Sequence, residues 1–197
     1  MSLLLKQAPS FILPLTRQQS ANSIQTINLR IRTHPFSRPI LLTTQNKPRF
    51  RMSHTYTSEY PAGLKVESGI KEFFEEFYKI SDTGTEEAHE RYADSWVQGG
   101  TIVMASKVGK GRDEILGIRK GMWEKVASRL HSPLKIFPFG ENANEVMLYG
   151  TVAYVLKDGR KANVEWGARA NLVKDDGKWK FKYYQVYLDT AAMANAK

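Results

Sequence analysis

The chain has 197 residues, enough for one domain plus an extension, and a formal net charge of +9. The charge is uneven: residues 1–52 contain eight Lys or Arg and no acidic side chain, whereas the remainder carries 21 basic and 20 acidic side chains. The nearly neutral remainder therefore gives no reason to expect a nucleic-acid partner. The lack of cysteine excludes disulfides and thiolate sites, and the four histidines are scattered, so we expect no metal and no cofactor.

Residues 1–60 are expected to form a basic N-terminal extension ahead of a domain spanning residues 61–197. The extension is rich in Ser, Thr and Gln with arginines spread along it, as is typical of an organelle transit peptide. The sequence after Met52 would equally make an ordinary cytosolic start, so both interpretations stay open and the location is cytoplasmic or mitochondrial. No run approaches ~20 apolar residues, so we expect no membrane span.

Three helices are predicted in the first half of the domain. Apolar residues at helical spacing over 65–80 predict the first, and Ala88, Tyr92 and Trp96, four apart, predict the second after the break "SDTGT". "TIVMAS" (101–106) is predicted as a short strand. The third helix is expected to begin at residue 112, with an apolar stripe that runs from Ile115 to Leu130.

The glycine- and lysine-rich segment "VGKGRDEI" precedes this third helix and superficially suggests a phosphate loop. Asp113 and Glu114 would put two carboxylates where the anion should lie, which excludes that function. Acidic residues in a first helical turn instead complement the helix dipole. The segment is therefore predicted to be a helix entrance.

Strand periodicity replaces helical periodicity from Pro133 onward. Four strands are expected, over residues 134–139, 145–156, 162–173 and 178–189, and the Asp-Gly pairs at 158–159 and 176–177 predict tight hairpins. Helices followed by strands indicate the α+β class. We expect three N-terminal helices packed on a strongly curved antiparallel sheet.

Two-residue turns at both Asp-Gly pairs would set the register of this sheet. They place Gly150 opposite Gly167, with Val186 on the other side of Gly167. Facing glycines let a sheet bend around a cavity, although the glycines could also be merely tolerated.

The same register assigns the side chains of the sheet to two faces. The cavity face would carry Tyr149, Trp166, Gln185, Tyr187 and Asp189. The outer face would carry Glu165, Arg169 and Tyr184, and its mixed apolar character predicts a homodimer through this surface.

The order of several short motifs resembles the SnoaL-like family of the nuclear-transport-factor-two-like superfamily. These motifs are "YADSW" at the end of a helix pair, "GRDEI" opening a third helix, and "DDGKWK" before the last strand, within Val66 to Asp189. The resemblance implies a cone-shaped α+β barrel that relatives use for isomerases, cyclases, dehydratases, ligand binders and dimerisation modules. Fold alone does not choose among these uses.

Catalytic members of that superfamily commonly place a carboxylate or histidine at the end of the first strand or inside the barrel. Here the first strand ends in Met104-Ala105-Ser106, without such a base. The candidate catalytic residues are therefore Asp189, Asp94 and His131. Each also has a structural alternative: a strand-end cap, a hydrogen bond to the following turn, or an imidazolium at a helix C-terminus.

Aromatic side chains are the expected walls of the cavity. The candidate ligand-binding residues are Phe77, Tyr92, Trp96, Trp123, Tyr149, Trp166, Gln185 and Tyr187. The sequence thus favours a cofactor-independent isomerase, cyclase or dehydratase acting on a hydrophobic carbonyl-bearing metabolite. A non-catalytic ligand-binding or dimerisation domain remains the alternative. Lysines alternate with aromatics over 178–183 and so lie on opposite faces, which argues against single-stranded nucleic acid.

Overall fold

The computed structural model describes residues 54–197. Residues 1–53, with most of the expected extension and both interpretations of it, lie outside the described residues. Residues 54–60 pack against the domain expected over residues 61–197. Glu59 pairs with β3 through backbone bonds from Glu59 N to Leu134 O (2.9 Å) and from Ile136 N to Glu59 O (3.0 Å). Tyr56 and Tyr60 pack against the core.

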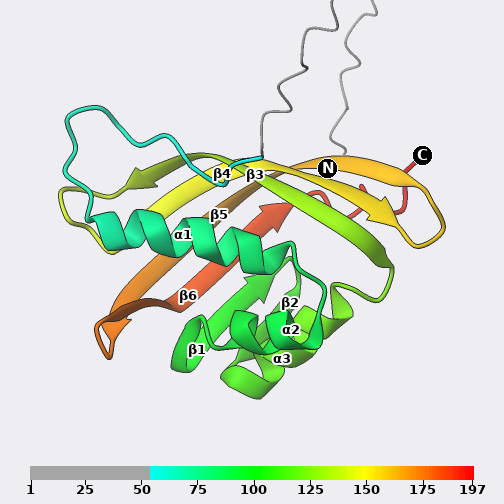
Figure 1. Ribbon diagram of the computed structural model, residues 1–197, viewed down its shortest axis with the longest axis horizontal. Helices are drawn as coiled ribbons and strands as arrows, with labels where there is room; N and C mark the ends of the chain where they lie inside the picture. The colour runs from blue at the N-terminus through cyan, green and yellow to red at the C-terminus, as the bar shows by residue number, and fades with distance from the viewer. Residues whose placement is uncertain (1–53) are drawn as a thin grey trace, which may run out of the picture. The chain divides into compact units, whose positions relative to one another are not determined.

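Three helices and six strands make up the described chain (Figure 1). In chain order they are α1 (Ser68–Ser81), α2 (Glu86–Ala93), β1 (Trp96–Met104), β2 (Lys107–Lys110), α3 (Arg112–Gly121), β3 (Val126–Pro138), β4 (Glu145–Leu156), β5 (Lys161–Asp175) and β6 (Lys178–Leu188). The predicted α+β class is confirmed. In the described part of the chain, no helix is long and apolar enough to cross a membrane.

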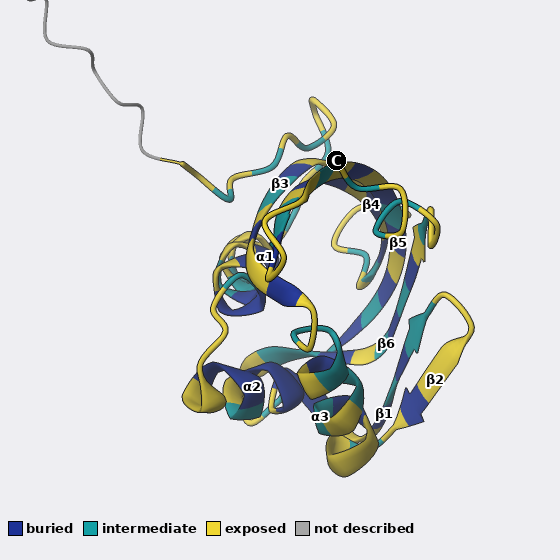
Figure 2. Cartoon of the chain, turned by 90° about the vertical axis from the view of Figure 1, so that its right-hand side faces the viewer, coloured by how far each residue is buried: buried dark blue, intermediate teal, exposed yellow. Residues whose placement is uncertain are grey.

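The six strands form one sheet in the order β2-β1-β6-β5-β4-β3. Pairing is antiparallel except between β1 and β6, which run parallel, so the sheet is mixed and not antiparallel throughout. The sheet bends around α1, which lies along its concave side, while α2 and α3 pack together beyond one end of α1 (Figure 1, Figure 2). The concave side is therefore enclosed by helices.

Two helices are shorter than predicted. α2 ends at Ala93, and Trp96 is the first residue of β1. α3 ends at Gly121, because the chain from Val126 onward pairs with β4 along its whole length. Leu130 is consequently 42% exposed on β3 and does not continue the buried helical stripe. The short strand β2 was not predicted from the sequence.

The expected register between β4 and β5 is wrong by one residue. The amide of Leu156 bonds to Arg160 O at 2.8 Å, which leaves a three-residue loop that ends at Gly159 with a φ of 89°. A type I turn followed by a left-handed glycine is a common three-residue hairpin loop. Gly150 therefore lies opposite Trp166, and Tyr149 lies opposite Gly167.

The β5–β6 turn is the predicted two-residue turn, but the register changes farther along the strands. Asp175 pairs with Lys178, and beyond Leu172–Phe181 the next pair is Asn171–Tyr183. Lys182 is thus an extra residue on β6, a β-bulge. The bulge shifts every later pair by one residue and places Tyr187 beside Gly167.

Only one of the two predicted glycines permits a close approach. A Cβ at Gly150 would lie 2.3 Å from the carbonyl oxygen of Ser132 and 2.8 Å from the Trp166 ring, so no larger residue fits. A Cβ at Gly167 would meet nothing closer than 3.8 Å. The sheet bends with β3 close against Gly150, where β3 also has a register shift between Pro133 and Lys135.

These register changes reverse part of the predicted sidedness of the sheet. On β5, Trp166 faces inward as predicted. On β4, Tyr149 is 40% exposed, and beyond the β6 bulge Tyr187 is 48% exposed while Tyr184 is 3% exposed. Gln185 shares the outer face with Tyr183, whose hydroxyl donates to Gln185 Oε1 at 2.7 Å. Tyr149, Gln185 and Tyr187 are therefore outer-face residues, and Tyr184 belongs to the interior.

Candidate functional site

A cavity of about 410 Å³ lies on the concave side of the sheet, beside the C-terminal end of α1. Its walls come from α1, α2, α3, β1, β3, β4, β5 and β6, and are mainly aromatic and aliphatic. The side chains that form its interior include Phe77, Tyr78, Tyr92, Val152, Tyr154, Trp166, Tyr184 and Val186. Its mouth is bordered by the β1–β2 turn, Met122 after α3, and Thr190 and Met193 of the C-terminal segment.

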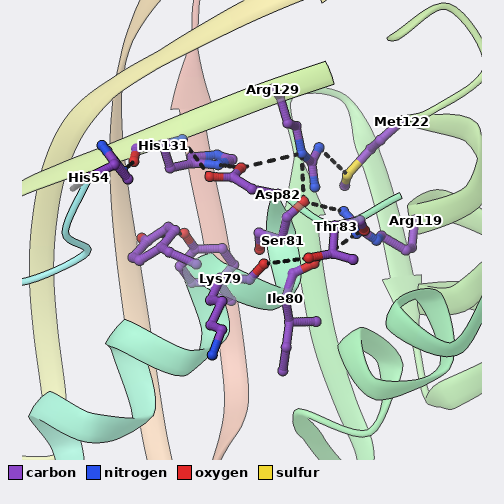
Figure 3. Close-up of polar contacts among 12 residues, drawn as sticks. His54, Lys79, Ile80, Ser81, Asp82, Thr83, Arg119, Met122, Arg129 and His131 are labelled. Carbon is purple, nitrogen blue, oxygen red and sulfur yellow. Dashed lines mark hydrogen bonds and ion pairs between the residues drawn. The ribbon is translucent and has the colours of Figure 1, made fainter. Parts of the chain in front are cut away.

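An Asp–His pair stands at the polar end of this cavity. Asp82 follows the last turn of α1, and His131 projects inward from β3 (Figure 3). His131 Nδ1 lies 2.5 Å from Asp82 Oδ1, and the backbone amide of His131 donates to Asp82 Oδ2 at 2.6 Å. The side chains are 14% and 5% exposed for His131 and Asp82. The carboxylate thus fixes both the ring and the strand that carries it.

The pair leaves His131 suited to accept a proton. Because Nδ1 donates to the carboxylate, Nε2 of the neutral ring is the acceptor. Burial lowers the pKa of His131, and this outweighs the opposing effect of Asp82, while Arg129 and Arg119 act in the same direction as burial. His131 lines the cavity, so a neutral imidazole faces the enclosed space at neutral pH.

Two buried arginines surround the end of α1. Arg119 is fully buried and donates to the carbonyl oxygens of Ser81 (2.9 Å), Ile80 (3.1 Å) and Thr83 (2.7 Å). Arg129 Nε donates to Ser81 O at 2.7 Å and lies 3.9 Å from Asp82 Oδ1. Burial lowers both pKa values, that of Arg119 to about 9. A guanidinium keeps its proton at neutral pH in proteins, so both side chains are cations. The arginines satisfy carbonyls that a helix end leaves unpaired.

The segment before α1 contacts both residues of the Asp82–His131 pair. His54 Nε2 lies 2.7 Å from the carbonyl oxygen of His131 (Figure 3). Burial raises the pKa of Tyr56 to about 12, with a further contribution from the nearby Asp82 carboxylate. Residues 54–60 therefore belong to the surroundings of the site as well as to the fold.

Tyrosine hydroxyls supply the other polar groups of the cavity. The Tyr78 and Tyr184 hydroxyls are 3.1 Å apart and buried. Tyr92 and Tyr154 also line the cavity, and no hydrogen-bond partner for either hydroxyl is found among residues 54–197. They are free to donate to a polar group of a bound molecule.

The structure brings four of the predicted site residues to the cavity. Phe77, Tyr92, His131 and Trp166 all line it. Trp96 packs in the core instead, with ring centroids 5.0 Å from both Tyr92 and Phe181. Trp123 lies in a separate surface groove near His89. Tyr149, Gln185 and Tyr187 point away, for the register reasons given above.

Asp94 and Asp189 do not reach the cavity. Asp94 is exposed and accepts from Arg112 Nε at 2.8 Å. Asp189 is exposed and accepts from the backbone amide of Ala191 at 2.8 Å, which is the capping role considered as its alternative. Neither is positioned for the predicted acid–base role, and His131 alone remains of the three candidates.

Sequence reasoning missed Asp82 and Arg129. Arg129 and His131 are two residues apart and therefore share one face of a strand, but the overlong third helix concealed this alternation. Asp82 was grouped with the polar residues of the "SDTGT" break. A strand prediction beginning at Val126 would have indicated a paired Arg and His facing inward.

No protein-family model matches the sequence, and no curated protein matches it. Solved structures do match the fold. A putative scytalone dehydratase from Novosphingobium aromaticivorans DSM 12444 has a TM-score of 0.52 at 17% identity, over 62% of this chain and 83% of that chain. A hexachlorocyclohexane dehydrochlorinase of type 2 has a TM-score of 0.52 at 16% identity, over 62% of this chain and 84% of that chain. An NTF2-like protein of unknown function from Exiguobacterium sp. 255-15 has a TM-score of 0.51 at 17% identity, over 60% of this chain and 98% of that chain.

These similarities, together with the bent sheet and the helices on its concave side, define the fold. The chain shares the α+β fold of these NTF2-like structures. At identities below one fifth, the comparison shows the fold alone. Function has to be argued from the cavity.

Proposed function

We propose that the protein is a cofactor-independent acid–base enzyme that acts on a hydrophobic, carbonyl-bearing small molecule. The observation that carries this proposal is the Asp82–His131 pair at the wall of an enclosed, largely apolar cavity. Dehydration, isomerisation and cyclisation can each begin with removal of a proton next to a carbonyl. Two similar folds bear the names of a dehydratase and a dehydrochlorinase, which perform eliminations, and this supports the same class of chemistry here.

In this mechanism His131 Nε2 takes the proton from the carbon next to the carbonyl. The C–H electron pair forms the new C=C bond, and the carbonyl π electrons move to oxygen as an enolate. Asp82 keeps Nδ1 protonated and stabilises the imidazolium that results. A hydroxyl of Tyr154 or Tyr92 can donate to the enolate oxygen. In a dehydration, the enolate electrons then re-form the C=O bond, the Cα=Cβ bond forms, and the bond from Cβ to the leaving oxygen breaks as the imidazolium protonates that oxygen. In an isomerisation, the imidazolium instead protonates another carbon of the enolate.

Elimination of nitrobenzisoxazole tests the base without knowledge of the substrate. The base removes the ring C–H proton, the N–O bond breaks, and a coloured cyanonitrophenolate forms. We expect the full-length protein to catalyse this reaction and His131→Gln to lose about 10²–10⁴-fold, the usual contribution of a positioned base. His89→Gln is the matched control, because His89 lies in the separate groove. The rate should rise with pH as His131 loses its proton, and it should be constant at and above pH ~6.5, because burial lowers the pKa of His131.

Two results would contradict the proposal. One is that His131→Gln, with an unchanged circular dichroism spectrum, eliminates the probe as fast as the wild type. The other is that the wild type is no faster than free imidazole at the same concentration. Either result would favour the alternative of a ligand-binding domain without catalysis.

We also propose that the protein is a homodimer through the outer sheet face, which carries Glu165 and Arg169 but not Tyr184. Met147 is 49% exposed and Tyr187 is 48% exposed on this face, beside Tyr149. Sedimentation equilibrium would test this: Tyr149→Glu should shift the protein towards monomer, whereas Lys157→Glu, at the hairpin loop, should not. A monomeric wild type would refute it.

A further inference from the structure

The cavity has an excess of positive charge. Among the side chains of residues 54–197 that line it are two cations, Lys107 at the mouth and Arg129 in the interior, and no carboxylate. Asp82 lies behind His131, bonded to the imidazole and the backbone amide of that residue, and its carboxylate also lies 3.9 Å from Arg129 Nε. Arg119, farther back, adds a second buried guanidinium that repels Arg129. The described residues therefore leave a buried positive charge without its full complement of negative charge.

Arg129 also has an unused donor. Its Nε donates to Ser81 O at 2.7 Å, and Nη1 has only a thioether contact with Met122 Sδ at 3.7 Å (Figure 3). Nη2 has no hydrogen-bond partner among residues 54–197, and it keeps some accessible surface. Arg129 as a whole is only 8% exposed. A buried guanidinium with a free donor is costly unless an anion or another acceptor occupies that position.

We propose that the natural ligand of this cavity is an apolar carboxylate and that its carboxylate accepts hydrogen bonds from Arg129. The carboxylate at Arg129 is the new part of this proposal. The position of the reacting C–H bond at His131 rests on the proposed function. Residues two apart on a strand are separated by about 7 Å. A single small molecule can therefore place its carboxylate at Arg129 and a carbonyl-activated C–H bond at His131 Nε2.

A carboxylate fits these walls better than a more highly charged anion. Among residues 54–197, one free guanidinium nitrogen and the unpaired hydroxyls of Tyr92 and Tyr154 are few donors for an interior whose other walls are mainly aromatic or aliphatic, and Lys107 lies at the mouth. A phosphate would leave most of its oxygens without donors in an apolar enclosure. The ligand is thus expected to carry one negative charge on an otherwise hydrophobic body.

Binding of naphthoate and naphthamide to the full-length protein tests the proposal. The two probes share the same ring system and differ in the charge of one group. Isothermal titration should give naphthoate at least about tenfold tighter binding, because a charge-assisted hydrogen bond is about twice as strong as a neutral one. Arg129→Met should abolish this preference and leave naphthamide binding nearly unchanged. Arg169→Met, which removes an arginine from the outer face, is the matched control and should keep the preference.

Equal binding of the two probes by the wild type would overturn the proposal, and so would a preference that survives in folded Arg129→Met. If Arg129→Met does not fold, the wild-type comparison still decides. The outcome is separable from that of the proposed function. Elimination of the neutral nitrobenzisoxazole without a naphthoate preference would refute the carboxylate alone, whereas a naphthoate preference with full elimination activity in His131→Gln would refute the base alone.

Discussion

The two ends of the concave side differ in what fills them. At one end, near the β5–β6 turn, aromatic rings pack against one another: the Phe181 ring lies 4.8 Å from Phe73 and from Phe77, and 5.0 Å from Trp96. At the other end the chain surrounds a cavity of about 410 Å³ with buried charges at its wall. We call these the packed end and the hollow end.

The same elements serve both ends. α1 contributes Phe74 to the packed end, Phe77 to both ends, and one turn later Ser81 to the hollow end. On β6 the bulge at Lys182 separates Phe181 from Tyr184. Close packing of aromatic rings stabilises the packed end, whereas empty volume and desolvated charges at the hollow end are destabilising.

The largest expected difference between the two ends lies in their tolerance to truncation. Leu172, 1% exposed, pairs with Phe181 at the packed end, whereas Leu188 lines the cavity. Leu172→Ala should lower the free energy of unfolding by about 3–5 kcal/mol, as expected when a fully packed leucine is removed. Leu188→Ala should lower it by only about 1–2 kcal/mol, because that side chain already faces space. Urea denaturation measures both, and equal losses would show that the cavity is filled in solution.

Removal of Arg119 tests whether the buried charges of the hollow end are structural. Arg119→Met removes three hydrogen bonds at the end of α1 and leaves Thr83 O without a donor among residues 54–197, whereas Ser81 O keeps Arg129 and Ile80 O keeps a backbone amide. The free energy of unfolding should therefore fall by about 2–4 kcal/mol. Arg112→Met is the matched control: it removes exposed ion pairs with Glu90 and Asp94, and little change is expected. If Arg119→Met is as stable as Arg112→Met, the guanidinium is not needed to end α1.

Tyr184 lies at the border between the ends, and its hydroxyl gives a smaller test. Tyr184→Phe leaves the buried Tyr78 hydroxyl without its partner at 3.1 Å, so the free energy of unfolding should fall by about 0.5–1.5 kcal/mol. Tyr183→Phe removes a partly exposed hydroxyl bond on the outer face and should have almost no effect. Equal effects of the two substitutions in urea denaturation would place Tyr184 outside, as the sequence had suggested.

The sequence predicted the fold well because hydrophobic periodicity and turn residues are local. The span of α1, the Asp176-Gly177 turn and the inward position of Trp166 all follow from such patterns. The predicted faces of β4 and β6 residues were wrong where one residue changed the register. Strict alternation of side chains predicts neither the three-residue loop after Leu156 nor the extra Lys182 on β6. A shift of one residue turns every later side chain to the opposite face.

The site was harder to predict than the fold because its parts are distant in the sequence. Asp82 and His131 are 49 residues apart, and only tertiary packing brings the end of α1 against β3. His131 was chosen as a titratable group near a predicted helix end, whereas the structure places it on β3, where it lines the cavity. Nothing local distinguishes Asp82 from an ordinary helix-ending aspartate, whereas the spacing of Arg129 and His131 contains a usable pattern once β3 is extended to Val126.

The smallest expected effect is a gradual dependence of the free energy of unfolding on pH. Burial lowers the folded-state pKa of His131 and of His89, so the unfolded state binds more protons once the pH falls below ~6.5. The free energy of unfolding should therefore decrease on acidification through that range and stay level above it. His131→Gln should make this decrease shallower, and His131→Gln with His89→Gln should make it shallower still. Urea denaturation at a series of pH values measures the slopes. A wild type that gains stability on acidification would mean that the Asp82 carboxylate raises the pKa of His131, so that the imidazole would be protonated in the cavity and unable to act as the base.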